Sequence, residues 1–588
     1  MPDVPLSGRS LVTGKAEGEV LYANAGLSFW GGIDPSTGDV IDQHHSLSGQ
    51  NVAGRILAIP GGRGSCTGSS ILLELITNGH APAALVFSER EEILTLGVII
   101  ADTLFGRSIP VLHLDEQSFA KLQFARFGRI QGSRLHLFDA EPGVSRDDVT
   151  ADESGTEDTT VELDETDRSL LDGSHGEAAQ IAMRIILRMA SLQRAHKLID
   201  VTQAHIDGCI YTGPACLLFA NKLKNRGARV RIPTTLNSIS VDQRRWRKMG
   251  VDTALGEPAS ALADAYMDMG AQLSFTCAPY LLDSAPKASE QIVWAESNAV
   301  VYANSVLGAR TQKYPDYLDI CIALTGRAPL TGCHLDENRH AAVRIDVPLL
   351  NGSDDAFWPL LGYHVGLLTG ASVPVICGLE EAGPGLDDLK AFGAAFATSS
   401  AAPMFHITGV TPEAATVAMA CGGKSPRRKL RVEPVDLLAS WNELNGAEDP
   451  QVDLVALGNP HFSLTECAML AELCNGRTKH PDVVLAVTLG RAVHEQARAA
   501  GYIAVLEAFG ALLINDTCWC MLGEPVIPPA ARTLMTNSGK YAHYAPNLIG
   551  RKVHFGSLAA CVDAACSGQA SGQLPAWLAV STEPKGIC

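Results

Sequence analysis

The chain has 588 residues, of which 46% are hydrophobic and 19% charged, and its formal net charge at pH 7 is −18. This length and composition predict three or four lobes with large buried cores. So acidic a chain is a poor match for proteins that bind nucleic acid or anionic membranes through a basic surface. The sequence has neither a secretory signal at its start nor an apolar run long enough to span a membrane. We therefore expect a cytoplasmic protein with no nucleic-acid or membrane partner.

The first 140 residues predict a small α/β domain. Short β-like runs occupy residues 18–24, 55–60, 83–88, 109–114 and 129–138, and a helix-like run occupies residues 69–79.

A glycine-rich turn joins the second of these runs to the helix in "AIPGGRGSCTGSSILLE", residues 58–74. The turn is not a Walker loop, because no lysine follows Gly68. Nor is it a dinucleotide fingerprint, because the third glycine comes one residue late. Backbone N–H groups and hydroxyls at a helix N-terminus nevertheless suit an anion or an oxyanion.

The segment after this domain is strongly acidic. Residues 139–173 contain thirteen Asp or Glu and two Arg, a net charge of −11. Low hydrophobicity and high charge predict a linker or a solvated surface excursion, which we place at residues 141–174.

The remaining residues, 175–588, predict a large domain in which buried strands alternate with helices, and hence parallel α/β sheets. Residues 176–201 have helical spacing of apolar side chains. Strands are expected at residues 228–237, 318–326, 374–379, 404–410, 452–459, 483–490 and 511–518. A sub-domain boundary is expected near residues 430–453.

Polar residues gather in strings after several of these strands, where α/β proteins place their chemistry. The candidates are Thr235, Asn237, Cys277, Glu290, Gln291, His461, Cys518, Cys520, Ser538 and Lys540. Taken singly, each is explained by a turn, a helix cap or core packing. Together they offer thiolates suited to an iron–sulfur cluster, and amides, hydroxyls and a lysine suited to a small carboxylate substrate. Most of the 15 cysteines are expected to be buried and free of disulfides.

Long strings of this sequence resemble the aconitase X family, a branch of the aconitase superfamily. "PGGRGSCTGSS" is similar to the loop of its small swivelling domain. "VRIPTTLNSISVDQRRW", "EQIVWAESNAVVYANSVLGART", "GNPHFSLTE", "DTC" and "MTNSGKYAHYAP" are similar to its large domain, in the family's order. The resemblance implies a swivelling β/α domain at residues 1–140 fused to a large catalytic domain at residues 175–588.

The resemblance also implies roles for residues in the loop. Ser65 matches the superfamily's base, Arg63 would stabilise its negative charge, and Cys66 is the rival base. In the large domain, Ser538 and Lys540 would anchor the substrate carboxylate. The other substrate-binding candidates are Thr235, Asn237, Cys277, Glu290, Gln291 and His461.

The implied cofactor is an iron–sulfur cluster, of the 2Fe–2S type in the single-chain form. Cys518 and Cys561 match family cysteines, and Cys421 or Cys520 would supply a third thiolate. This chain departs from the family at Asn459, where much of the family has cysteine, so one thiolate ligand is missing there.

The activity implied for a single-chain form is dehydration of cis-3-hydroxy-L-proline, a cyclic hydroxy amino acid. The alternatives are dehydration of mevalonate 5-phosphate or another hydroxy acid, with Arg63, Arg310 and Lys540 as candidate phosphate ligands, or a binding protein without catalysis. We expect a monomer or a small homo-oligomer.

Overall fold

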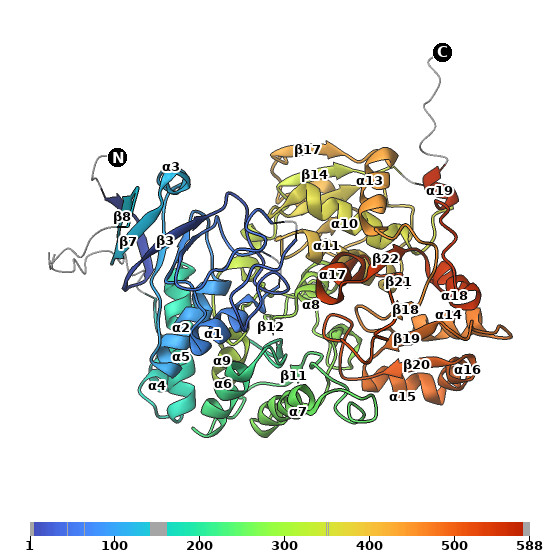
Figure 1. The fold of residues 1–588 in the computed structure, drawn as a ribbon, viewed down its shortest axis with the longest axis horizontal. Helices are drawn as coiled ribbons and strands as arrows, with labels where there is room; N and C mark the ends of the chain where they lie inside the picture. Colours follow the sequence, from blue (N-terminus) through green and yellow to red (C-terminus); the bar gives the residue numbers. More distant parts are fainter. Residues whose placement is uncertain are drawn as a thin grey trace, which may run out of the picture. The chain divides into compact units, whose positions relative to one another are not determined.

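The structure is a computed structural model that describes residues 5–43, 45–63, 65–141, 161–348, 350 and 352–579. The chain divides into two compact units (Figure 1). Unit 1 comprises residues 1–234, 264–271 and 314–331, and unit 2 comprises residues 235–263, 272–313 and 332–588. Within the described ranges, every helix is too short or too polar to cross a membrane.

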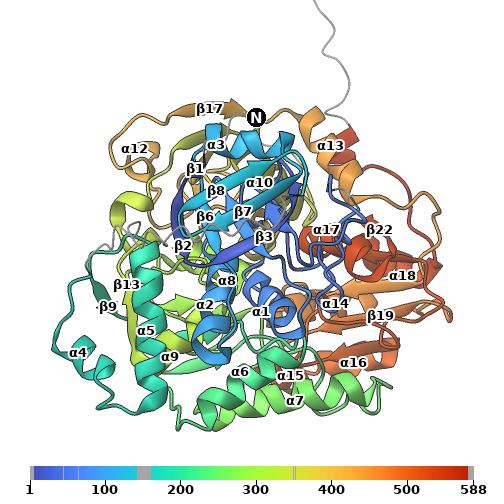
Figure 2. The same ribbon diagram turned by 60° about the vertical axis from the view of Figure 1, so that its left-hand side comes forward.

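Unit 1 contains a mixed sheet of the first eight strands, in the order β1-β8-β7-β3-β4-β5-β6-β2. The strands are β1 (Leu6–Ser7), β2 (Arg9–Val12), β3 (Lys15–Tyr22), β4 (Ile56–Ala58), β5 (Ala84–Phe87), β6 (Val111–His113), β7 (Phe127–Gln131) and β8 (Arg134–Phe138). β3 to β6 pair in parallel, and β7 and β8 add antiparallel strands beside β3 (Figure 2). The five β-like runs of the first 140 residues are therefore confirmed as strands.

Helices follow the parallel strands of this sheet. They are α1 (Gly68–Asn78), α2 (Ile93–Phe105) and α3 (Glu116–Ala120), with a short 3₁₀ turn η1 (Lys121–Phe124). α1 and α2 pack against each other, and a Cβ at Gly97 of α2 would come within 2.7 Å of the Ser69 carbonyl oxygen. Only glycine permits so close a contact between the two helices.

The rest of unit 1 is mainly helical. It contains α5 (Glu177–Leu192), α6 (Pro214–Lys224) and α9 (Leu318–Thr325), with a strand pair β9 (Leu198–Asp200) and β13 (Arg327–Pro329). The strand expected at residues 318–326 is wrong, because these residues form α9. All eight residues of α9 are buried, so the run is apolar on every side and lacks the helical period.

Part of the acidic segment is helical instead of forming a linker. α4 (Glu165–Leu171) begins with Asp164 and Asp167 as a capping box. The guanidinium of the buried Arg327 binds Asp164, Asp167 and Asp200 at 2.6 to 2.8 Å. This ion cluster holds residues 161–174 against the unit, and the rest of the predicted linker, residues 142–160, lies outside the described residues.

Unit 2 contains two parallel sheets, as the alternating pattern predicts. One has the order β16-β15-β14-β17 and the other β20-β19-β18-β21-β22. The strands are β14 (Val343–Asp346), β15 (Pro374–Cys377), β16 (His406–Ile407), β17 (Arg428–Arg431), β18 (Leu454–Leu457), β19 (Val484–Thr488), β20 (Ala511–Ile514), β21 (Thr533–Thr536) and β22 (Lys552–Phe555). All pairings within these two sheets are parallel. An α/β class with several parallel sheets is thus confirmed.

The helices of unit 2 cover these sheets. They include α8 (Ser297–Tyr302), followed by the π-helical turn η3 (Ala303–Leu307), α10 (Phe357–Thr369), α11 (Leu386–Ser399), α12 (Val417–Ala420), α13 (Pro434–Leu444), α14 (Leu464–Cys474), α15 (Arg491–Ala499), α16 (Tyr502–Phe509), α17 (Gly539–Ile549), α18 (Leu558–Ser567) and α19 (Ala576–Ala579). The chain also contains the long helix α7 (Thr253–Asp268) and the short elements β10 (Ala204–Ile206), β11 (Thr234–Leu236), η2 (Pro279–Leu281), β12 (Val293–Trp294), η4 (Gly332–His334) and η5 (Asp336–Asn338).

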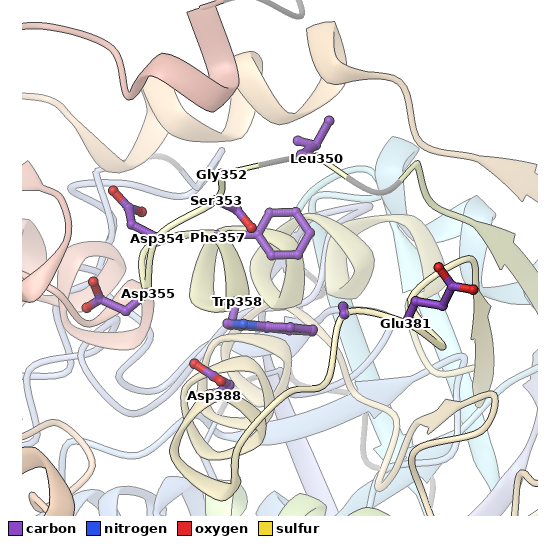
Figure 3. Close-up of a pocket in the computed structure, with 10 residues that line it drawn as sticks. Leu350, Gly352, Ser353, Asp354, Asp355, Phe357, Trp358, Glu381 and Asp388 are labelled. Atoms are coloured by element: carbon purple, nitrogen blue, oxygen red, sulfur yellow. The ribbon is translucent and has the colours of Figure 1, made fainter.

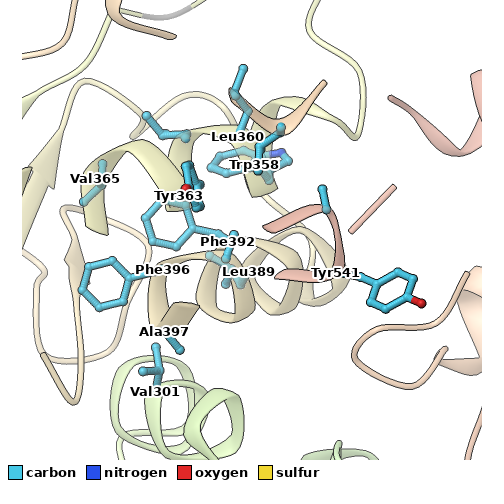
Figure 4. Packing of buried hydrophobic residues seen from close by; sticks show 14 of the residues in the cluster. Val301, Trp358, Leu360, Tyr363, Val365, Leu389, Phe392, Phe396, Ala397 and Tyr541 are labelled. Carbon is cyan, nitrogen blue, oxygen red and sulfur yellow. The ribbon is translucent and has the colours of Figure 1, made fainter. Parts of the chain in front are cut away.

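The main core of unit 2 lies where α10 and α11 pack together (Figure 4). Leu360, Phe392 and Phe396 are fully buried there, and Val301 of α8 joins them. Gly362 allows the two helices to touch, because a Cβ on it would come within 2.2 Å of the Phe392 carbonyl oxygen. Tyr541 of α17 belongs to the same cluster, so the strand-end residues around it are attached to a rigid core.

Candidate functional site

The glycine-rich loop of unit 1 places Ser65 just before helix α1. The Ser65 hydroxyl accepts a hydrogen bond from the Thr67 backbone N–H at 3.2 Å and donates one to Thr67 Oγ1 at 3.0 Å. Ser65 is partly exposed, whereas Gly64 lies outside the described residues. Its hydroxyl oxygen therefore faces the positive end of the helix, where negative charge is stabilised.

Two other residues of the loop, Cys66 and Arg63, were candidates for the rival base and for the group that stabilises negative charge on Ser65. Cys66 has no exposed side-chain surface, so its thiol is not placed to meet a substrate. Arg63 is exposed, and its guanidinium binds the buried Asp42 at 2.9 Å. Arg63 is thus engaged by a carboxylate of its own unit.

Two carboxylates of unit 1 hold the loop and its helix in place. Asp316 accepts a hydrogen bond from the Ser70 hydroxyl at 2.8 Å, and its N–H donates to the Cys66 carbonyl at 3.4 Å. Glu74 accepts the backbone N–H of Ala215 at 2.8 Å, at the start of α6. The base candidate therefore belongs to a loop that is fixed on both sides.

Unit 2 brings together three thiols, which we call the thiol cluster: Cys277, Cys518 and Cys520. Cys518 is hydrogen-bonded to both of the others; Cys277 and Cys518 are buried, and Cys520 is half-buried. Cys518 and Cys520 follow β20, where the sequence predicted polar chemistry. Cys277 comes from a separate segment before η2.

The three thiols differ in acidity. Burial raises the pKa of Cys277, but the hydrogen bond from Cys518 and the interaction with His461 lower it more, to about 5. The hydrogen bond from Cys518 also lowers the pKa of Cys520. The hydrogen bonds with Cys277 and Cys520, followed by burial, raise the pKa of Cys518 well above its usual value. The cluster can thus present thiolates, which are soft metal ligands.

The ligand set Cys518, Cys561 and Cys421 is not brought together. Cys561 lies in α18 within an apolar cluster that includes Leu558 and Val562, and burial raises its pKa. Cys421 lies in a different apolar cluster with Cys377. We therefore remove Cys561 and Cys421 from the ligand set, because both behave as small buried hydrophobes.

The thiol cluster has further polar atoms beside it. In the described ranges, no set of three or more His, Cys, Asp or Glu side chains has the arrangement of a bound metal ion. Asn459 donates from Nδ2 to the Cys520 sulfur at 3.3 Å. The buried Asn459 Oδ1 and Thr517 Oγ1 have no hydrogen-bond partner. Three contacting thiols with unsatisfied polar atoms beside them fit a sulfur-rich group.

His461 supports the thiol cluster and is not free to bind a substrate. Its Nε2 donates to the Thr517 carbonyl at 2.8 Å, and its Nδ1 is hydrogen-bonded to the Thr276 hydroxyl at 3.1 Å. Its backbone N–H donates to the Cys277 sulfur at 3.3 Å. Since both ring nitrogens are engaged and the ring is fully buried, His461 positions the loop.

Lys540 forms a buried ion pair that the sequence did not predict. Its Nζ lies 2.7 Å from Oε1 of Glu296. Asn298 Nδ2 donates to the same oxygen at 2.5 Å, and Asn237 Nδ2 donates to Oε2 at 3.3 Å. Two predicted residues, Asn237 and Lys540, thus meet at one carboxylate.

Ser538 and Thr235 lie at the edge of this group. Ser538 caps α17, accepting the Tyr541 N–H at 3.1 Å and donating to the Asn459 carbonyl. Thr235 is buried and pairs through its backbone with Gln272, two residues before Asn237 in the chain.

Glu290 and Gln291 belong to a different network. Gln291 Oε1 contacts His334 Nδ1 at 2.6 Å, and its Nε2 donates to the His334 carbonyl at 3.4 Å. The Glu290 carbonyl accepts the Arg310 N–H at 2.8 Å. Burial, together with the neighbouring Arg339 and Arg310, lowers the pKa of His334 to about 3, so its ring is neutral at pH 7.

A cavity of about 420 Å³ in unit 2 lies apart from these residues (Figure 3). It is lined by Leu350, Gly352, Ser353, Asp354, Asp355, Phe357, Trp358, Glu381, Ala382 and Asp388. Its four carboxylates and two aromatic rings include none of the predicted site residues, and it offers neither a cation nor a thiol for a carboxylate substrate.

Sequence reasoning missed Glu296, Asn298 and the importance of Cys520. Glu296 and Asn298 stand in the string "WAESNA", but carboxylates and amides commonly cap helices, and Glu296 does precede α8. In an extended loop alternate side chains face opposite ways, so the thiols at 518 and 520 would not meet. In the structure residues 519–521 form a turn, which allows both thiols to meet.

Family models match nearly the whole chain. They are the aconitase X swivel domain (residues 5–137), first domain (160–337), second domain (341–442) and third domain (452–567).

Curated relatives match over the same length. The chain is 61% identical to a cis-3-hydroxy-L-proline dehydratase of Pseudomonas aeruginosa over 97% of this chain and 98% of that protein. It is 56% identical to one of Hypocrea jecorina over 98% of both chains. A phosphomevalonate dehydratase large subunit of Methanothermobacter thermautotrophicus is 36% identical over 66% of this chain and 95% of that subunit. The crystal structure of Thermococcus kodakaraensis aconitase X (holo-form) matches with a TM-score of 0.62 and 31% identity, over 69% of this chain and 100% of that chain.

Proposed function

Because the chain belongs to the aconitase X family, we propose that it is a hydro-lyase that dehydrates cis-3-hydroxy-L-proline to Δ1-pyrroline-2-carboxylate. One observation carries the choice of substrate. The identity to two proteins of that name extends over 97% and 98% of this chain, through both the swivel and the large domains. The phosphomevalonate dehydratase large subunit is less similar, at 36% identity over 66% of this chain.

The pairing of the basic residues also argues against a phosphate ester. The three cations that could bind a phosphate are Arg63, Arg310 and Lys540. They are paired with Asp42, Asp336 and Glu296, respectively. Each positive charge is thus balanced by a carboxylate of its own, which disfavours a dianionic phosphate.

In the proposed reaction, Ser65 removes the proton from the carbon next to the carboxylate. Its hydroxyl oxygen faces the N-terminus of α1 and the Thr67 N–H, which stabilise the negative charge that proton transfer requires. Loss of the 3-hydroxyl then leaves a ring enamine, which tautomerises to the cyclic imine, so the sum is one water lost.

Dehydratases of the aconitase family generally depend on an iron–sulfur cluster. We propose that Cys277, Cys518 and Cys520 hold it here, as a 2Fe–2S cluster. When bound, such a group supplies a Lewis acid for the departing hydroxyl. His461 and Asn459 hold the Cys277 and Cys520 sulfurs through N–H donors. Lys540, in the first turn of α17, would bind the substrate carboxylate.

Purified protein incubated with cis-3-hydroxy-L-proline tests this proposal. We expect Δ1-pyrroline-2-carboxylate, detected by NMR, and little or no turnover of mevalonate 5-phosphate. Turnover of the phosphate ester alone would reverse the assignment, and binding of both compounds without turnover would favour a non-catalytic protein. Iron and sulfide analysis of the same sample tests the cluster, and metal-free protein with full activity would exclude it.

A further inference from the structure

The Lys540–Glu296 pair lies in the interior of unit 2 and still reaches solvent. Lys540 and Glu296 keep 11% and 10% of their side-chain surface exposed. A buried ion pair is weak evidence for stability, because the cost of removing both charges from water offsets their attraction. The slight exposure leaves both charged groups in contact with solvent.

The carboxylate of Glu296 is held by two amides whose orientation is fixed. Asn298 Nδ2 also donates to the Cys277 carbonyl at 3.1 Å, and a carbonyl only accepts. The Ser238 N–H donates to Asn237 Oδ1 at 2.7 Å, and an N–H only donates. Both amides therefore turn their NH₂ groups toward Glu296 and keep its charge in one place.

The pair also adjoins the proposed cluster ligands. Asn298 binds the Cys277 carbonyl, and the electrostatic neighbours of Lys540 include all three thiols besides Glu296. A substrate that binds Lys540 is therefore close to the group that would take up its hydroxyl.

Resting on the proposed function, we propose that Glu296 is the residue that selects an amino acid as substrate, by binding its ring ammonium while Lys540 binds its carboxylate. An α-amino acid carries both charges on one carbon, with polarity opposite to that of the protein pair. Its entry replaces one ion pair by two and adds no net charge. A hydroxy acid without an amine would instead bring a second negative charge beside Glu296 and leave that carboxylate uncompensated.

Two inert ligands with the same ring separate the amine from the carboxylate. L-Proline and (S)-tetrahydrofuran-2-carboxylate differ in having a ring ammonium or a ring oxygen. We expect calorimetric titration of the holoenzyme to show that proline binds about tenfold or more tightly than the oxygen analogue. Equal affinities, or preference for the analogue, would overturn the proposal without any variant being needed.

Glu296→Gln removes the negative charge and keeps the side-chain shape. We expect it to weaken proline binding about tenfold or more while changing the oxygen analogue less than about threefold, and Glu296→Asp to keep the preference for proline. A control is Glu413→Gln, which breaks the ion pair of the half-buried Glu413 with the buried Arg339 in unit 2 and should leave the preference intact. A Glu296→Gln variant that keeps the full preference overturns the inference. If wild-type protein prefers proline but does not turn over cis-3-hydroxy-L-proline, the proposed function fails and the amine selection stands.

Discussion

Arg491 holds both carboxylate oxygens of Asp516. Its Nε and Nη2 lie 2.6 and 2.7 Å from Oδ1 and Oδ2, and the Asp516 side chain is fully buried. Asp516 has a φ of 69°, a left-handed conformation that most side chains avoid. Asp516 also accepts the backbone N–H of Gln243 at 3.1 Å. The turn that leads to Cys518 is thus fixed two residues before the first thiol.

We therefore expect Arg491→Gln to disturb the thiol cluster without touching it. Removing one partner of a buried ion pair costs about 3–5 kcal/mol, because the remaining charge stays buried. The variant should contain markedly less iron and sulfide per chain than wild type and unfold at a lower temperature. Both are measured on the purified protein.

Two substitutions at Asp516 separate charge from backbone conformation. Asp516→Asn removes the charge, but asparagine still accepts the left-handed φ. Asp516→Ala removes the charge and also makes that φ unfavourable. We expect cluster content to fall in the order wild type, Asn, Ala. Wild-type iron content in Arg491→Gln and in both Asp516 variants would show that this pair does not position the thiols.

Much of the fold could be predicted from apolar patterning. The strands β4 (Ile56–Ala58), β5 (Ala84–Phe87) and β19 (Val484–Thr488) are short apolar runs with turn residues beside them, and buried parallel strands have that pattern. The pattern fails where burial is complete on every side. Residues 318–325 are as apolar as a buried strand, yet they form α9, because periodicity does not separate a fully buried helix from a strand.

The candidate site was predictable in part. Its polar strings follow buried strands, so Cys518, Asn237 and Lys540 could be named from position and residue type. Their partners could not, because the Lys540–Glu296 contact joins residues 244 positions apart. The choice among fifteen cysteines was likewise open, because the sequence does not show which cysteines lie close together. Cys561 and Cys518 are both buried, but Cys561 lies among apolar side chains, whereas Cys518 is hydrogen-bonded to two other thiols.

The side-chain amide of Asn459, at the position where the resemblance implies a cysteine, lies 3.3 Å from the Cys520 sulfur. Asn459→Cys should therefore place a fourth thiol beside the thiol cluster. We expect more iron per chain and an altered visible absorption spectrum, since thiolates bind iron more strongly than an amide does. Asn459→Ala is the control, because it removes the amide without adding sulfur. Identical iron, sulfide and spectra in the two variants would contradict this geometry.

Ser65 and Cys66 can be told apart by their exposure. Ser65→Ala should lower kcat by about 10²–10⁴-fold, which is the usual contribution of a general base. The dissociation constant for proline should stay within about threefold of the wild-type value. Cys66→Ala should keep kcat near wild type, because the thiol is fully buried, and should lower only stability. Steady-state kinetics with calorimetry tests both. The reverse result, an active Ser65→Ala and an inactive Cys66→Ala, would transfer the base to the thiol.

Glu91 gives unit 1 a predictable pH dependence. Its carboxylate is buried and accepts the backbone N–H groups of Leu94 and Thr95 at 2.9 and 3.0 Å, at the start of α2. Burial raises its pKa to about 7, from an ordinary value of 4.5, although these hydrogen bonds lower it. The folded protein therefore binds a proton between pH 4.5 and 7 that the unfolded chain has released, so stability falls as pH rises through this window.

Glu91→Gln should abolish that part of the pH dependence, because glutamine does not ionise. Because of this pKa shift, the free energy of unfolding of the wild type should fall by about 3 kcal/mol between pH 5 and pH 8. The variant lacks that loss, so its stability relative to wild type should rise by the same amount over the interval. Thermal unfolding midpoints of both proteins at pH 5, 6, 7 and 8 measure the difference. Glu116→Gln, an exposed carboxylate in α3, is the control and should show no such trend. If the midpoint difference between Glu91→Gln and wild type stays constant with pH, the carboxyl of Glu91 does not titrate in this range and its burial is compensated by its two amide donors.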